Sequence, residues 1–207
     1  SSEVECRVKI SPPMAFVRRK IGLKVDAAYT LHDMASDGKA LLQSLRLENV
    51  HLLGISMGGM IAQLIAADPE ISPASLTLVM TSDNHPKLPM PDINTLWRLN
   101  GSGIRGHDLE AALKRGMAFW DCVASPAYPS PKDRISQRIA RDYQRSYRPQ
   151  GIMRQMRSIM ATGSIEEWSR KIDVPTLILH GADDPLVKVQ AAHRLQDNIP
   201  HSKLDII

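Results

Sequence analysis

Residues 50–81 constrain the fold of this chain more than any other segment. The apolar run Val50–Ile55 is too short for a helix and leads into Gly54-Ile55-Ser56-Met57-Gly58. Apolar residues then recur every three or four positions until Asp68-Pro69, and a second apolar run covers Ser75–Thr81. Strand, helix and strand in this order predict a βαβ unit with two buried, parallel strands.

Ser56 stands at the junction between the first of these strands and the helix. The spacing G-x-S-x-G is typical of a serine on a sharp strand-to-helix turn. The glycines two positions to either side are expected to leave room for a strained backbone and for close helix packing. This context favours a nucleophilic serine, and the alternative is a plain tight turn with an inert serine.

The segment before residue 50 also predicts regular secondary structure. Thr30 can cap a helix that runs to about Arg46, with Asp33 at the capping-box position. A short alternation near the start, at residues 4–10, suggests a strand that Pro12-Pro13 ends. The expected apolar face of the Thr30 helix consists of Leu31, Met34, Ala35, Leu41, Leu42 and Leu45.

From Asp83 to about Arg170 the sequence predicts helices that prolines interrupt, and it contains no convincing strand. Predicted strands reappear after this segment. We expect a strand at Pro175–His180, a helix at Val187–Asp197 and a further strand that opens at Lys203–Ile207. The middle segment is therefore interpreted as an insertion or cap between two parts of one sheet.

A second candidate group follows the Pro175–His180 strand, at the sheet edge where α/β folds place their chemistry. Asp184 precedes Pro185, which biases its backbone toward an extended loop conformation. A carboxylate there could orient a histidine and stabilise its protonated form. The alternative is an Asp-rich turn that serves only as a connection.

Composition excludes several classes of protein. The 207 residues suffice for one domain, and a formal net charge of +4 with 4% aromatic residues does not predict nucleic-acid binding. Cys6 and Cys122 are interpreted as free thiols in a reducing compartment. No apolar run suggests a membrane helix, so we expect a soluble, cytoplasmic protein. The oligomeric state is not predicted.

The remaining motifs carry weaker hypotheses. His32, His51 and His85 lack metal-ligand spacing, so no metal is assigned. The apolar stripe Ile152–Met160 could line an acyl pocket or pack over the sheet. Basic residues in the stretch 131–160 could favour an acidic ligand, although a solvated face is the preferred interpretation. These basic residues are Lys132, Arg134, Arg138, Arg141, Arg145, Arg148, Arg154 and Arg157.

Three segments together resemble the α/β-hydrolase superfamily. They are Tyr29-Thr30-Leu31-His32-Asp33-Met34-Ala35, the stretch from Gly54 to Gln63, and Pro175 to Gly181 with Asp183-Asp184-Pro185-Leu186-Val187. The similarity covers about residue 20 to the end. It is strongest to the esterase-like branch that includes aclacinomycin methylesterase and relatives of proline iminopeptidase.

This resemblance implies an α/β-hydrolase fold, a mostly parallel sheet flanked by helices, with a helical cap. Residues 1–82 and 171–207 would form the core sheet and residues 83–170 the cap, within one domain. Ser56 would be the nucleophile, Asp184 the triad acid and the backbone N–H of Met57 one oxyanion-hole donor. No cofactor is implied.

Two departures from the family pattern make the expected fold incomplete. The base should follow the last strand, where His193 and His201 are the only histidines after Asp184, and neither is expected to reach the serine. The early strands and the loop that supplies the second oxyanion donor should precede Tyr29, and residues 1–28 are too few to hold them. The base is therefore expected outside this chain.

The function implied for the complete protein is that of a serine hydrolase acting on a small carboxylic ester, or less readily on an amide or thioester. Two other hypotheses stay open. The chain could be a non-catalytic fragment or binding module. Alternatively, the same scaffold could serve a cofactor-free haloperoxidase or an aminopeptidase.

Overall fold

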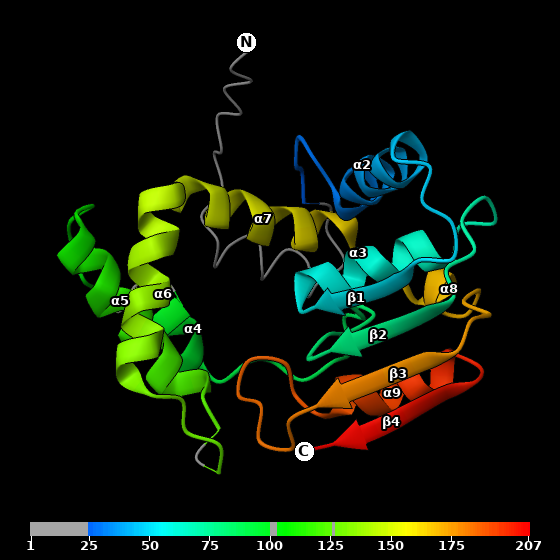
Figure 1. Ribbon diagram of the computed structural model, residues 1–207. Helices are drawn as coiled ribbons and strands as arrows, with labels where there is room; N and C mark the ends of the chain where they lie inside the picture. Colours follow the sequence, from blue (N-terminus) through cyan, green and yellow to red (C-terminus); the bar gives the residue numbers. More distant parts are fainter. Residues whose placement is uncertain (1–24, 100–102, 126) are drawn as a thin grey trace.

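A parallel sheet organises the chain, and the computed structural model describes residues 25–99, 103–125 and 127–207. Four strands pair in sequence order, and every pair is parallel (Figure 1). All four carboxyl ends therefore share one edge of the sheet, where α/β folds place their chemistry. The strands are β1 (His51–Ile55), β2 (Ser75–Val79), β3 (Thr176–His180) and β4 (Ser202–Ile206).

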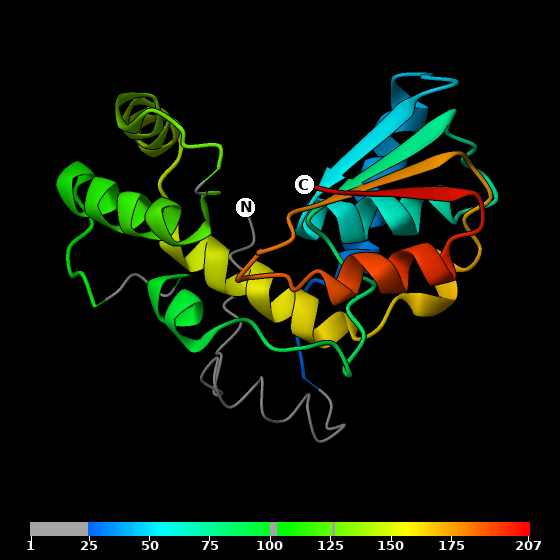
Figure 2. The same cartoon turned by 90° about the horizontal axis from the view of Figure 1, so that it is seen from below.

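One face of this sheet is covered by helices and forms the core (Figure 2). Leu76, Leu78 and Ile178 point to that face and are at most 1% exposed. Because strand side chains alternate between the two faces, their neighbours point the other way. The helices that contact the strands are α3 (Met57–Ala66) and α9 (Gln190–Asn198), and α2 (Leu31–Ser44) and α8 (Glu166–Ser169) pack against these helices.

The opposite face of the sheet is open within the described part of the chain. Leu53, Ile55 and Leu177 are 65%, 50% and 38% exposed. The prediction that β1 is buried is therefore wrong for Leu53 and Ile55, which point away from the helices. Its inward residue Gly54 is buried beneath α3.

Helix α2 begins with the predicted capping box. The Thr30 hydroxyl accepts a hydrogen bond from the Asp33 N–H, and the Asp33 carboxylate accepts one from the Thr30 N–H at 2.7 Å. Hydrogen bonds from Thr30 hold the pKa of the Asp33 carboxyl below its usual value. The predicted apolar face is correct for Leu31, Met34, Ala35 and Leu42, which join one core cluster, and wrong for Leu41 and Leu45, which are exposed.

Other boundaries differ from the prediction by a few residues. Strand β2 ends at Val79 because Met80 turns into the left-handed region, at φ 41°. Helix α9 starts at Gln190 rather than Val187. The N–H groups of Leu186 and Val187 donate to the Asp184 side chain, so these residues form a turn before the helix. The strand expected at residues 4–10 lies outside the described residues.

Residues 83–170, called the helical insertion below, leave the sheet at its carboxyl edge (Figure 1). The described residues of this segment form helices and no strand. Cys122 is a free thiol there, whereas Cys6 lies outside the described residues. In the part of the chain that is placed, no helix combines the length and apolarity needed to cross a membrane. Before α8, the insertion contains α4 (Ile93–Leu99), α5 (Leu109–Val123), α6 (Lys132–Arg145) and α7 (Pro149–Thr162).

Truncating one leucine on each face of the sheet tests this asymmetry. Leu76→Ala should lower the free energy of unfolding by about 2–5 kcal/mol, because it opens a cavity in the core. Leu53→Ala should change it by less than about 0.5 kcal/mol, because Leu53 faces solvent. Urea unfolding followed by circular dichroism measures both. A comparable loss for the two variants would mean that another surface covers the open face.

Candidate active site

Ser56 alone joins β1 to α3 and adopts a strained backbone conformation. Its φ is 52° and its ψ is −121°, a region that non-glycine residues rarely occupy. Its N–H donates to the Val79 carbonyl at 3.0 Å, and its carbonyl accepts from the Thr81 hydroxyl at 2.6 Å. Its own side chain makes no capping hydrogen bond. Val79 and Thr81 therefore hold the backbone, while the hydroxyl at the carboxyl edge has no hydrogen-bond partner among the described residues.

Two glycines allow α3 to start without a loop. A Cβ atom on Gly54 would lie 2.5 Å from the Gly59 Cα, and one on Gly59 would lie 2.6 Å from the Thr81 Cβ. A Cβ on Gly58 would meet nothing within 4 Å. The expectation that both glycines of G-x-S-x-G make room is thus correct for Gly54 and wrong for Gly58. Gly59, one position outside the motif, permits the close helix packing.

Met57 is the first residue of α3. The first N–H groups of a helix have no acceptor within that helix, and the helix dipole makes this end partly positive. The Met57 N–H therefore belongs to the partly positive end of α3, next to Ser56 along the chain. Among the described residues, we assign no second hydrogen-bond donor for an oxyanion.

Asp184 lies in the turn after β3, on the same edge of the sheet as Ser56. Its Oδ1 accepts hydrogen bonds from the N–H groups of Leu186 at 2.8 Å and Val187 at 2.9 Å. The side chain is mostly buried, with 13% exposed. Since β2 separates β1 from β3, the two strands that lead to Ser56 and Asp184 lie about 10 Å apart, a gap that an imidazole could bridge.

His180 ends β3 and packs against the turn that contains Asp184. The sequence alone does not identify it as a site residue. It is 1% exposed, and its Nε2 lies 2.6 Å from the Val187 carbonyl oxygen. Because a carbonyl only accepts, Nε2 carries the proton, and the same atom is 3.8 Å from the Asp184 Oδ2. Among the described residues its Nδ1 has no partner. The only sequence signal was a histidine at the end of an apolar strand.

The structure brings neither late histidine into hydrogen-bonding range of Ser56 among the described contacts. His193 is exposed on α9. His201 precedes β4 at the amino edge of the sheet, opposite Ser56, where it lies 3.7 Å from Asp173. No group of His, Cys, Asp and Glu side chains in the described ranges could hold a metal ion.

A buried ionic network ties the start of the helical insertion to the core. Asp83 is fully buried, and its Oδ2 accepts hydrogen bonds from Arg194 Nε at 2.6 Å and Asn198 Nδ2 at 3.2 Å. Arg194 also contacts Glu166 at 2.6 Å, and His85 lies 3.6 Å from the same carboxylate. The network spans the first residues of the insertion, α8 and α9.

Backbone contacts join the two ends of the insertion to each other. The Ile165 N–H donates to the Asp83 carbonyl at 2.9 Å. The Asn84 amide donates to the carbonyls of Ile159 at 2.8 Å and Gly163 at 2.6 Å. The insertion therefore leaves and re-enters the core through one cross-linked junction.

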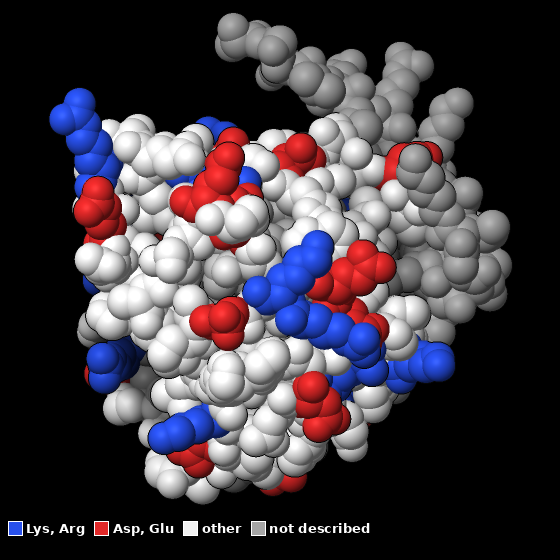
Figure 3. Space-filling model, turned by 90° about the vertical axis from the view of Figure 1, so that its right-hand side faces the viewer, with Lys and Arg blue, Asp and Glu red and all other residues white. Residues whose placement is uncertain are grey.

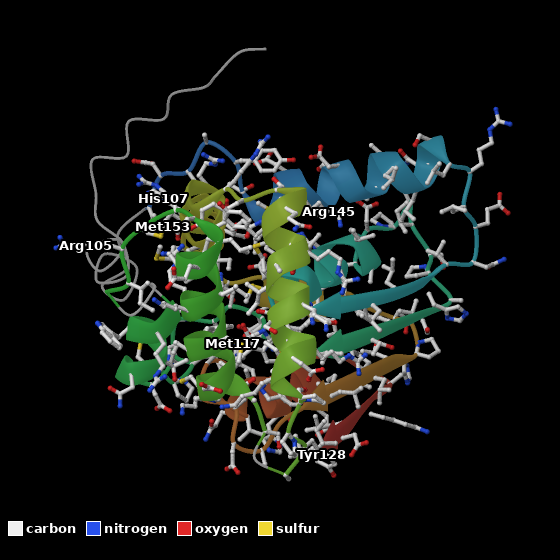
Figure 4. The ribbon with its side chains drawn as sticks, turned by 60° about the vertical axis from the view of Figure 1, so that its left-hand side comes forward. Arg105, His107, Met117, Tyr128, Arg145 and Met153 are labelled. Atoms are coloured by element: carbon white, nitrogen blue, oxygen red, sulfur yellow. The ribbon has the colours of Figure 1, made fainter. Side chains whose placement is uncertain are left out.

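Farther out, the insertion presents an exposed basic surface. The arginines of α6 are exposed, and Arg138 lies over the Trp120 ring of α5, 5.8 Å from its centroid. Figure 4 shows Arg145 at the end of α6 and Met153 on α7. The apolar stripe of α7 is divided. Ile159 packs against the core cluster that contains Leu31 and Met60, and Met160 is buried beside Val25, whereas Ile152 is 54% exposed.

A small cleft lies beside the Asp184 turn, between residues 82–91 and 186–191. Its volume is about 150 Å³ and its walls are mainly apolar. An apolar cavity of that size holds a molecule about as large as benzene. The ion pair between Lys188 and Asp92, 2.9 Å long, stands at its rim. The wall residues are Ser82, Asn84, Pro86, Leu88, Pro89, Met90, Pro91, Leu186, Val187, Lys188 and Ala191.

Comparison with known families identifies the scaffold that carries these groups. The family model of the alpha/beta hydrolase fold matches residues 11–207. The chain belongs to this family. Ser56 and Asp184 both lie within the matched residues.

Individual relatives are distant. The chain is 24% identical to 3-oxoadipate enol-lactonase 1 of Acinetobacter baylyi over 185 residues, which is 86% of this chain and 63% of the lactonase. The enol-lactonase from Burkholderia xenovorans superposes with a TM-score of 0.66 at 16% identity, over 88% of this chain and 66% of that one. An esterase from Exiguobacterium antarcticum gives 0.62 at 22% identity, over 87% and 66%. The chain thus spans less than two thirds of the length of these proteins.

The packing at the serine turn makes opposite predictions for adjacent glycines. Gly59→Ala should lower the midpoint of thermal unfolding by several degrees, because its methyl group would overlap Thr81 in a packed interior. Gly58→Ala should leave the midpoint unchanged or raise it, since alanine favours a helix where space is open. Equal effects of the two substitutions in differential scanning calorimetry would contradict this account of the turn.

The buried network predicts a large penalty for losing Asp83. Asp83→Ala should cost about 3–5 kcal/mol of unfolding free energy, because it leaves the Arg194 guanidinium without its buried partner. Asp92→Ala removes the exposed pair with Lys188 and should cost less than about 1 kcal/mol. Denaturant unfolding compares the two. A cost for Asp83→Ala as small as the control would show that the network does not anchor the insertion.

Proposed function

We propose that the complete protein is a serine hydrolase that cleaves carboxylic esters of small molecules, cyclic esters included. The observation that carries the proposal is the strained backbone of Ser56, which presents an uncommitted hydroxyl at the carboxyl edge beside the N-terminus of α3. Such strain is typical of functional residues. The relatives named as an esterase and as enol-lactonases support an ester bond as the target.

In this proposal Ser56 attacks the carbonyl carbon of the ester, the bond to the alcohol breaks, and the alcohol leaves with the proton that the histidine took from Ser56. Water then cleaves the acyl-enzyme and releases the acid. The Met57 N–H donates to the oxyanion of each tetrahedral intermediate, where the helix dipole adds to its effect. Asp184 orients the histidine that takes the serine proton and stabilises the imidazolium. Its Oδ1 is held by two N–H groups, which leaves Oδ2 for that histidine.

The base itself is proposed to come from the part of the complete protein that follows β4. Ile207 pairs with the turn after β3, since its N–H donates to the His180 carbonyl at 2.9 Å and its carbonyl accepts from the Ala182 N–H at 2.8 Å. A loop that continued from this residue would start next to the Asp184 turn. A histidine there could contact Asp184 and Ser56 together.

The helical insertion is proposed to act as a cap over the serine. It leaves and re-enters the core at the carboxyl edge, through the Asp83 junction. The cleft of about 150 Å³ beside Asp184 would accept a small apolar part of the substrate, because prolines, leucines and Met90 line it. The finer resemblance to the aclacinomycin methylesterase branch stays a prediction.

Hydrolysis by the complete protein tests the proposal. A panel of p-nitrophenyl esters, lactones, amino-acid anilides and a haloperoxidase assay should give activity on esters or lactones. Ser56→Ala should abolish it, and Asp184→Asn should lower kcat by about 10⁴-fold, because the histidine would lose its orienting carboxylate. Asp183→Asn, one position away, is the matched control. Ester cleavage near the parental rate in Ser56→Ala would refute the assignment, and activity on anilides alone would favour an aminopeptidase.

A further inference from the structure

A second cleft lies at the amino edge of the sheet, at the far end of α3 from Ser56. Its volume is about 650 Å³, within the usual range of small-molecule sites. The first turns of α2, the last turn of α3 and the segment around α8 form its walls. Because α3 has ten residues, about 15 Å separate this cleft from Ser56.

One wall of this cleft is aromatic. The rings of His32 and Trp168 have centroids 4.6 Å apart, with their planes inclined by 56°. Both side chains are half-buried and line the cleft. Leu64, Ala66 and Ala67 of α3 add an apolar surface next to them. A flat ring could therefore contact aromatic and apolar atoms at once.

The charges around this cleft leave one cation without a protein partner. Lys39 donates to Asp68 and holds the pKa of that carboxyl below its usual value. Asp173 lies 3.7 Å from His201. Lys171 is exposed on the rim and forms no ion pair with any residue in the described ranges. Figure 3, which faces this side, shows Lys and Arg side chains gathered beside Asp and Glu side chains.

We propose that this cleft binds a planar aromatic carboxylate, with its ring against His32 and Trp168 and its carboxylate on Lys171. The carboxylate is placed on Lys171, because Asp68 is paired with Lys39, and Asp173, which is 87% exposed, lies nearest to His201 outside the cleft. The size of the cleft leaves room for a ring with substituents. This site is separate from Ser56 and does not depend on the proposed hydrolysis.

The fluorescence of Trp168 can report ligand binding in this cleft. It has three tryptophans, of which Trp97 and Trp120 lie in the helical insertion. In the variant Trp97→Phe/Trp120→Phe, Trp168 is the only one left. Benzoate should change its fluorescence saturably with a Kd of about 1 mM or tighter. Benzyl alcohol, of similar shape without the charge, should bind about tenfold more weakly.

Substitutions in the same background locate the ligand. Lys171→Gln should weaken benzoate binding about tenfold and leave benzyl alcohol binding unchanged. Lys114→Gln, which removes an exposed lysine of α5, should change neither. Ser56→Ala should also bind benzoate normally, so this proposal can hold or fail independently of the hydrolase assignment.

Three results would overturn the proposal. The first is the absence of a saturable change, and the second is equal binding of benzoate and benzyl alcohol. The third is an affinity for benzoate that is unchanged in Lys171→Gln or lost in Ser56→Ala, because the ligand would then sit elsewhere.

Discussion

The single-residue connection between β1 and α3 sets the geometry of the whole core. With no loop to absorb the change of direction, the backbone of Ser56 takes the strain, and the helix must begin in contact with the strands. Gly54 and Gly59 allow that contact, and the hydroxyl of Thr81, just after β2, donates to the Ser56 carbonyl. The same constraint that packs the helix therefore leaves Ser56 at the start of α3, next to Met57.

Buried polar groups extend this rigidity away from the turn. Gln63 of α3 is fully buried and donates to the carbonyls of Gly59 and Ser82, both at 3.1 Å, while the Ser169 hydroxyl donates to it at 2.8 Å. Asp83 continues the network to α9. Buried polar groups in a fully satisfied network specify one arrangement, since any other leaves a group unpaired. The helical insertion is thereby anchored to the elements that carry Ser56 and Asp184.

Much of this architecture follows from local sequence patterns. The order of strands and helices after Tyr29, the Thr30 capping box and the turn at Ser56 are short-range features, and their signals lie within a few residues. The buried roles of Asp83 and His180 could not be predicted, because their partners are distant in sequence or are backbone groups. For the same reason, the sequence does not distinguish Gly59 from Gly58, because only the approach of Thr81, just after β2, makes a side chain at residue 59 impossible to fit without a shift.

Labelling of the complete protein with a fluorophosphonate tests the central claim most directly. The reagent modifies serines that a neighbouring base activates, and peptide mass spectrometry locates the adduct. One adduct is expected, on the peptide that contains Ser56, and none in the Ser56→Ala variant. Labelling of another serine, or none at all in a folded protein that cleaves esters, would contradict the assignment of Ser56 as the nucleophile.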